Sequence, residues 1–249
     1  MTHIGALSKI SGGYSVALSG VTAASAEKFA ADSRVRSLAV SDTSAAIAGK
    51  LDALHGLGAQ LTGINQSDSG PVAVTAGQRL NYGQTLAKLG DSYTLAVRGA
   101  MVKEVDALKD DSHVATIAVA DTSASIAASL DSLQDNAKLS AISLLDKGRP
   151  LSLNVTQLTR DAGALGKIQG NYTLALSGVA ASDALTQAQN SKVSALSVTD
   201  NGAGIVANLA DLARLGGKLR SIQDTDSTPL LNMDTCLLYT SPSPRDAHE

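Results

Sequence analysis

Two patterns of apolar positions alternate along this chain. Leu38 and Val40 fall on one face of a segment whose intervening residues are small or polar, and this alternation predicts a β-strand. Farther on, Ile47, Leu51 and Leu54 fall at positions i, i+4 and i+7, which predicts one apolar stripe of an amphipathic helix. Residues 35–54 are therefore predicted to form a short strand, a turn marked by Asp42 and a short amphipathic helix.

Polar residues and glycines mark the ends of that predicted helix. Asp42 and Thr43 precede it, where a side-chain oxygen can accept a free backbone N–H of the first turn. Gly56 and Gly58 lie where the apolar stripe stops, as expected for a helix C-terminus.

The same strand, turn and helix recur with a fixed spacing. Residues 35–54 return as 114–133 and again as 193–212, each time 79 positions farther along the chain. The same spacing relates further sets of residues, so the chain is internally duplicated. These sets are Tyr14, Tyr93 and Tyr172; Lys9, Lys88 and Lys167; and Pro71, Pro150 and Pro229.

One period divides into three strand–helix steps. A strand from Tyr93 precedes a helix near 101–111, and a strand from Val114 precedes a helix near 122–136. In the third step the strand from Leu139, a turn at Pro150 and a second short strand precede a helix near 157–168. Strands that alternate with helices in this way predict a parallel sheet with right-handed crossovers.

The fold class that follows is α/β. Nearly equivalent steps stack most simply in sequence order, so we predict a right-handed, leucine-rich-repeat-like α/β solenoid with one continuous parallel sheet. A β-helix with short helical corners and a compact α/β domain are the alternatives.

The composition limits which residue types can build the core and which classes of partner the chain can bind. Aromatic residues make up 2% of the 249 residues and Trp is absent, so Ala, Val, Leu and Ile must build the core. The net charge of −3 and the lack of a basic run argue against a nucleic-acid or anionic-membrane partner. No apolar run approaches the roughly 20 residues of a membrane span, and the first residues lack a signal-peptide pattern.

The end of the chain differs from the repeat. Residues 236–246 resemble, residue for residue, the translation of a transposase sequencing adaptor, so we exclude 236–249 as a disordered, adaptor-derived tail. The repeat region is then 1–235, and the single cysteine lies outside it. Residues 1–10 align with 80–89, inside a period, so we expect the region to be truncated at both ends.

Acidic residues after the predicted strands are the most regular polar feature. Stacked carboxylates could bind Ca²⁺, which takes six to eight oxygen ligands. However, each step offers one carboxylate, the Gly-Gly-x-Gly-x-Asp pattern is absent, and helix capping explains the same positions. We therefore assign no metal ligand among Asp42, Asp121, Asp200, Asp68, Asp146 and Asp226.

The sequence gives weaker support for a nucleotide-binding site or a histidine metal site. Gly202 and Gly204 superficially resemble a dinucleotide-binding turn, but the other copies lack these glycines, so we assign no cofactor-binding residue. His3, His55 and His113 share no position in the period and show no metal-ligand spacing, so we expect surface histidines.

Catalysis has no sequence support either. No Ser–His–Asp triad can be placed, and we find no polar cluster that one copy carries and its siblings lack. The three period-related tyrosines are expected to pack with their hydroxyls at the rim. We predict that the chain is not an enzyme.

The repeat as a whole resembles the repeats of large α-proteobacterial secreted or surface proteins, often found beside RTX-type calcium-binding arrays. The resemblance is carried by Leu-Ser-Lys-Ile at 7–10, Ser-Gly-Val at 19–21, Asp42-Thr43 and Leu-Asp-x-Leu at 51–54, with their copies. It implies an extended, adhesin- or RTX-like extracellular or cell-surface scaffold, exported by a type I system, whose partners are neighbouring repeats of a longer chain. A calcium-responsive binding module that uses the post-strand Asp residues is the alternative.

Overall fold

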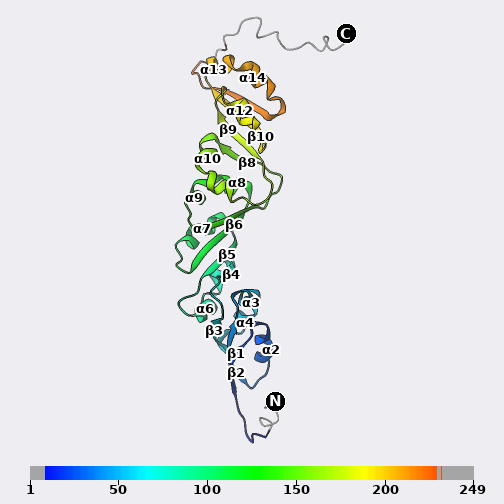
Figure 1. Ribbon diagram of the computed structural model, residues 1–249, viewed down its shortest axis with the longest axis vertical. Coiled ribbons are helices and arrows are strands. Elements are labelled where there is room, and N and C mark those ends of the chain that lie inside the picture. The colour runs from blue at the N-terminus through cyan, green and yellow to red at the C-terminus, as the bar shows by residue number, and fades with distance from the viewer. Residues whose placement is uncertain (1–8, 229–230, 232–249) are drawn as a thin grey trace, which may run out of the picture. The chain divides into compact units, whose positions relative to one another are not determined.

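The computed structural model describes residues 9–228 and 231 and alternates short parallel strands with short helices (Figure 1). This confirms the predicted α/β class and the parallel strand pairing. The described residues form two compact units, one within ranges 9–120 and 136–143 and the other within 121–135 and 144–228. The tail predicted at 236–249 and His3 lie outside the described residues.

The first unit holds two sheets, in the strand orders β1-β2-β3 and β4-β5-β6-β7. Its elements are β1 (Val16–Val21), η1 (Ala23–Ser25), α2 (Ala26–Ala30), β2 (Val35–Asp42), α3 (Ser44–Gly49), α4 (Leu51–Gly56), η2 (Gly58–Gln60), β3 (Leu61–Gln66), β4 (Val72–Thr75), α5 (Ala76–Asn81), α6 (Gly83–Leu86), η3 (Ala87–Leu89), β5 (Leu95–Ala100), α7 (Val102–Lys109), most of β6 (Val114–Asp121) and most of β7 (Leu139–Leu144).

The second unit holds one sheet, in the order β11-β10-β9-β8. Its elements are α8 (Ser123–Ala128), α9 (Leu130–Gln134), β8 (Leu151–Asn154), α10 (Val155–Arg160), α11 (Ala162–Gly166), β9 (Leu174–Val179), α12 (Ala184–Gln189), β10 (Val193–Asp200), α13 (Gly202–Ala207), α14 (Leu209–Arg214), η4 (Gly216–Lys218) and β11 (Leu219–Asp224).

Strand pairing corrects the prediction of one continuous sheet, because the described strands form three separate sheets. Between β3 and β4 the chain passes through Gly70 and Pro71, and proline has no N–H to donate to a ladder. The Gln66 side-chain amide donates to the Gly70 carbonyl at 2.6 Å, which folds this turn back on itself. The chain thus leaves one sheet before β4 starts the next.

The predicted apolar stripes are buried. Leu38 and Val40 of β2 are 0% and 1% exposed, and Ile47, Leu51 and Leu54 are between 0% and 1% exposed. The buried apolar side chains of the described residues are all Ala, Val, Leu or Ile, as the composition predicts.

The long helices predicted in each period are divided. The helix expected at 122–136 is two helices, α8 and α9, and the one expected at 157–168 is α10 and α11. Between α8 and α9, Ser129 has φ −118° and ψ 16°, outside the helical region. No proline or glycine stands there, so local propensity does not predict the break. The helix expected at 101–111 is observed as the single helix α7.

A glycine near the end of the first strand of each period has a left-handed backbone. Gly20, Gly99 and Gly178 have φ of 69°, 66° and 67°. At each of them the parallel register shifts, as between Arg98 and Ala100 in β5. Only glycine adopts this conformation at little cost, so the bulge explains why glycine recurs there.

Among the described residues no helix combines the length and the apolar character needed to cross a membrane. This agrees with the absence of long apolar runs in the sequence.

Candidate functional site

The carboxylates that follow the second strand of a period connect neighbouring steps. Asp42 accepts a hydrogen bond from the backbone N–H of Ala23, the first residue of η1, at 2.9 Å, and another from Thr43 at 2.9 Å. Asp200 repeats this arrangement with Ala181 at 2.9 Å and Asn201 at 2.8 Å. Each carboxylate therefore ties the start of the preceding helical segment to its own turn.

The residue directly after each of these carboxylates is the N-cap of the helix that follows it, Thr43 for α3 and Asn201 for α13. The Thr43 hydroxyl accepts from the Ala46 N–H at 3.3 Å, and Asn201 accepts from the Gly204 N–H at 2.7 Å. The prediction that Asp42 and Thr43 serve helix capping is confirmed, with their roles divided. Thr43 caps its own helix, whereas Asp42 binds the helical segment of the step before.

The acidic residues of the third step also bind the start of the helix in the step before them. Asp68 accepts from the Ser44 backbone N–H at 2.9 Å and from its hydroxyl at 3.0 Å, at the start of α3. The two other copies repeat the backbone contact: Asp146 accepts from Ser123 at 2.7 Å and Asp226 from Gly202 at 3.0 Å. We call these contacts, made by Asp42, Asp200, Asp68, Asp146 and Asp226, the capping ladder. A carboxylate at a helix N-terminus is also favoured by the helix dipole.

Hydrogen bonding lowers the pKa of two of these carboxyl groups. The Ser44 backbone N–H lowers the pKa of Asp68 below its ordinary value of 3.8, and the Ser123 backbone N–H does the same for the pKa of Asp146. Both donors favour the ionised form, which is the form that caps the helix.

These shifts predict a loss of stability in acid. Because both pKa values are lower in the folded chain, the stabilisation is fully present above the unfolded-state pKa of about 3.9 and is lost as pH falls through the lower folded-state values. We expect the midpoint of urea unfolding to decrease below about pH 4. The double variant Asp68→Asn/Asp146→Asn should show a flatter decrease than the exposed control Asp106→Asn. Equal slopes in the two variants would contradict the assignment.

The carboxylates do not gather into a metal centre. Within residues 9–228, no group of three or more His, Cys, Asp or Glu side chains is placed to hold a metal ion. Both carboxylate oxygens of Asp42 and of Asp68 already accept hydrogen bonds from the chain.

Gly204 of the third copy does not leave room for a phosphate. A Cβ on Gly204 would lie 2.6 Å from a carboxylate oxygen of Asp200. The space beside this glycine is therefore occupied by a negative group, which repels an anion.

Each period-related tyrosine contacts a basic side chain. Tyr14 accepts a hydrogen bond from Arg34 at 3.0 Å, and Tyr172 accepts one from Lys192 at 2.8 Å. In the second copy the basic partner is His113, whose ring stacks on that of Tyr93 with centroids 4.1 Å apart. These pairs were not predicted from the sequence, although the spacing of 79 between Arg34, His113 and Lys192 is a visible signal.

His55 also has specific partners. Its ring stacks on Tyr82 at 3.9 Å, and its Nδ1 atom lies 3.0 Å from the Thr85 hydroxyl. A hydrogen bond with the Asp52 carboxylate raises the pKa of Tyr82. His55 is exposed, as expected, whereas Thr85 is only 4% exposed.

Arg79 and Asp111 form a charged pair that is not repeated one period later, which corrects the sequence interpretation. Arg79 donates to Asp111 at 2.6 Å, and these side chains are 24% and 13% exposed. Leu158 and Asn190 stand 79 positions after Arg79 and Asp111. Asp111 also accepts from the backbone N–H of His113 at 3.0 Å. Arg79 and Asp111 thus satisfy each other's charge and join α5 to the turn before β6.

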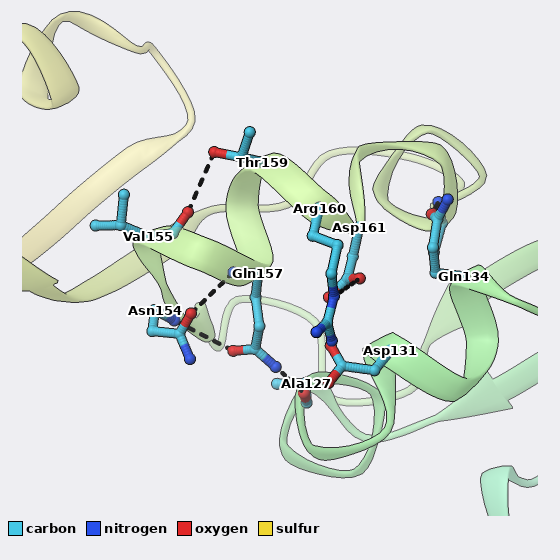
Figure 2. Close-up of polar contacts among 10 residues, drawn as sticks. Ala127, Asp131, Gln134, Asn154, Val155, Gln157, Thr159, Arg160 and Asp161 are labelled. Atoms are coloured by element: carbon cyan, nitrogen blue, oxygen red, sulfur yellow. Dashed lines mark hydrogen bonds and ion pairs between the residues drawn. The ribbon is translucent and has the colours of Figure 1, made fainter.

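A second charged cluster joins α9 to α10 and α11 (Figure 2). Arg160 pairs with Asp131 and, at 3.2 Å, with Asp161, a fully buried residue with one carboxylate oxygen that has no partner. Nearby, Gln134 accepts from the backbone N–H of Ala164 at 2.7 Å. These contacts hold one step against the next and leave the Arg160 guanidinium occupied by two carboxylates.

Shallow grooves recur at matching positions of two copies. Their volumes are about 400 and 600 Å³, and small side chains line much of both. The matching lining residues are Ala45, Ala48, Gly49, Ala73 and Gln78 in one groove and Ala124, Ala127, Ala128, Ser152 and Gln157 in the other. In each, the glutamine is part of a capping box at the start of α5 or α10.

No protein-family model matches this chain, and a comparison with curated proteins finds no significant similarity.

Proposed function

We propose that the chain is a non-enzymatic tandem-repeat segment of a larger secreted or cell-surface protein and acts as an extended scaffold. Its strand–helix steps would stack as an α/β solenoid in which the sheet is interrupted once per period. The partners expected from the resemblance of its repeat are neighbouring repeats of the same longer chain.

The capping ladder is the observation that supports this proposal. Each carboxylate caps the helix of the step before it, so the free N–H groups of one step are satisfied by the next. A contact that recurs at the same position of successive copies stabilises nearest neighbours, which is the energetic basis of repeat proteins. Among the described charged side chains, Arg79 and Asp111 likewise bind each other.

Deleting one whole period tests the scaffold. Removal of residues 93–171 joins Ser92 to Tyr172 and preserves the repeat order. We expect a folded protein with unchanged circular dichroism per residue. Its maximum dimension in small-angle X-ray scattering should be shorter by at least about 14 Å, from the three hydrogen-bonded strand spacings of a period at about 4.8 Å each. Deletion of 93–151, which is not a whole period, is the control and should unfold. Loss of folding in the whole-period deletion would contradict the proposal.

The alternative function is a calcium-responsive binding module. Because the oxygens of Asp42 and Asp68 accept N–H groups, we expect excess Ca²⁺, followed by a chelator, to leave the melting temperature unchanged. A calcium site filled at 100 times its dissociation constant would instead add about 2.7 kcal/mol to the free energy of unfolding. A rise in melting temperature that the chelator reverses would favour the module over the scaffold.

A further inference from the structure

Strand β1 has a sheet edge that is covered in the other two copies. β5 pairs with β6 on one side and with β4 on the other, and β9 pairs in the same way with β10 and β8. Among the described residues β1 pairs with β2 alone. The repeat therefore shows what lies on this edge when it is occupied: a four-residue strand that follows a proline, at Pro71 or Pro150.

The backbone of β1 presents the groups that such a strand uses. The Thr94 carbonyl, just before β5, accepts from the Val72 N–H of β4 at 2.9 Å. Its counterpart one period earlier is the Ser15 carbonyl. In β1 the Val16 N–H donates to Arg34, toward β2, at 2.8 Å. Because successive N–H groups of a strand alternate in direction, the Ala17 N–H points away from β2, to the edge that no described strand covers.

The apolar side chains of β1 are less buried than those of β5. Leu95 and Val97 of β5 are 0% and 1% exposed, because their sheet continues past them. The matching residues, Val16 and Leu18, are partly exposed. An open row of backbone groups beside partly exposed apolar side chains is the arrangement that accepts an added strand.

We propose that the open edge of β1 binds an extended strand of the type Pro-Val-Ala-Val-Thr, residues 71–75, supplied by another copy of this repeat. The added strand runs parallel to β1, with its first N–H after the proline donating to Ser15, as Val72 donates to Thr94. A proline at the start costs this ladder nothing, because the first donor is the residue after it. The inference does not rest on the scaffold function, since it concerns one sheet edge and one peptide.

The test uses the full chain, labelled with ¹⁵N, and a synthetic peptide of residues 70–77. At a peptide concentration about ten times the dissociation constant, roughly 90% of the chain is bound, and hydrogen exchange at the Ala17 and Ser19 amides should slow about tenfold. The amides of Val16 and Leu18, which face β2, should change little. A peptide with Val72→Asp and Val74→Asp, whose counterparts in β4 are 0% and 2% exposed, is the matched control and should not bind.

Two variants of the chain separate edge binding from other binding. Ala17→Pro removes a donor from the open edge and should abolish the slowed exchange at Ser19. Leu18→Ser keeps every backbone donor and should weaken peptide binding at least severalfold, which provides the test if the proline variant does not fold. Unchanged exchange at Ala17 and Ser19 with the peptide, or equal binding to a folded Ala17→Pro variant, would overturn the proposal.

Discussion

Replacing Leu51 with alanine is expected to lower the free energy of unfolding by about 2–5 kcal/mol. The side chain is 1% exposed and belongs to the apolar stripe with Ile47 and Leu54. Its truncation removes buried apolar surface and leaves a cavity that close-packed neighbours fill only partly. Urea unfolding followed by far-UV circular dichroism measures this loss.

The repeat supplies a matched comparison for this substitution. Leu209 occupies the same position of the third copy but is only partly buried. Leu209→Ala should therefore cost less than Leu51→Ala. Leu80→Ala, at a side chain that is 60% exposed, should change the free energy of unfolding by less than about 0.5 kcal/mol. An equal loss in all three variants would show that burial does not set the stability of the stripe.

Replacing Gly99 with alanine is expected to cost about 1–2 kcal/mol, the strain of an L-residue in the left-handed region. Nothing lies within 4 Å of the added Cβ, so the loss comes from the backbone conformation alone. The φ of 66° is set by the bulge in β5, where the register shifts between Arg98 and Ala100. The midpoint of urea unfolding, at an unchanged m-value, gives the size of the effect.

Gly63→Ala is the control for this prediction. Gly63 lies in β3 without a positive φ, and its added Cβ also meets nothing within 4 Å. The equivalent strand β7 has Ala141 at this position. Since alanine lowers the entropy of the unfolded chain, Gly63→Ala should raise the free energy of unfolding by about 0.4–1 kcal/mol. A loss for Gly63→Ala as large as that for Gly99→Ala would refute the backbone explanation.

Contacts between residues close in the chain could be predicted from the sequence. Alternation at Leu38 and Val40 located β2, and the i, i+4, i+7 spacing from Ile47 to Leu54 located the buried helical face. The spacing of 79 established the duplication without any structure. These features depend on local periodicity, which can be read directly from the order of the residues.

The candidate site was predicted only in part. The sequence placed Asp42 and Asp68 after strands and indicated capping, but it did not show which helix each one caps. Asp42 binds Ala23, 19 residues earlier, and Asp68 binds Ser44, 24 residues earlier. The partner of each carboxylate depends on which strands lie side by side. The pairing of Tyr14 with Arg34 across 20 residues was missed for the same reason.

The sequence by itself determined the repeat, the α/β class, the apolar core positions and the residue types that cap helices. Only the tertiary structure decided where each sheet stops, where the long helices divide, as at Ser129, and which step a carboxylate stabilises. The physical reason is that pattern and propensity act within a few residues. Sheet pairing and capping between steps join residues about 20 positions apart, and parallel strand pairing alone brings those residues together.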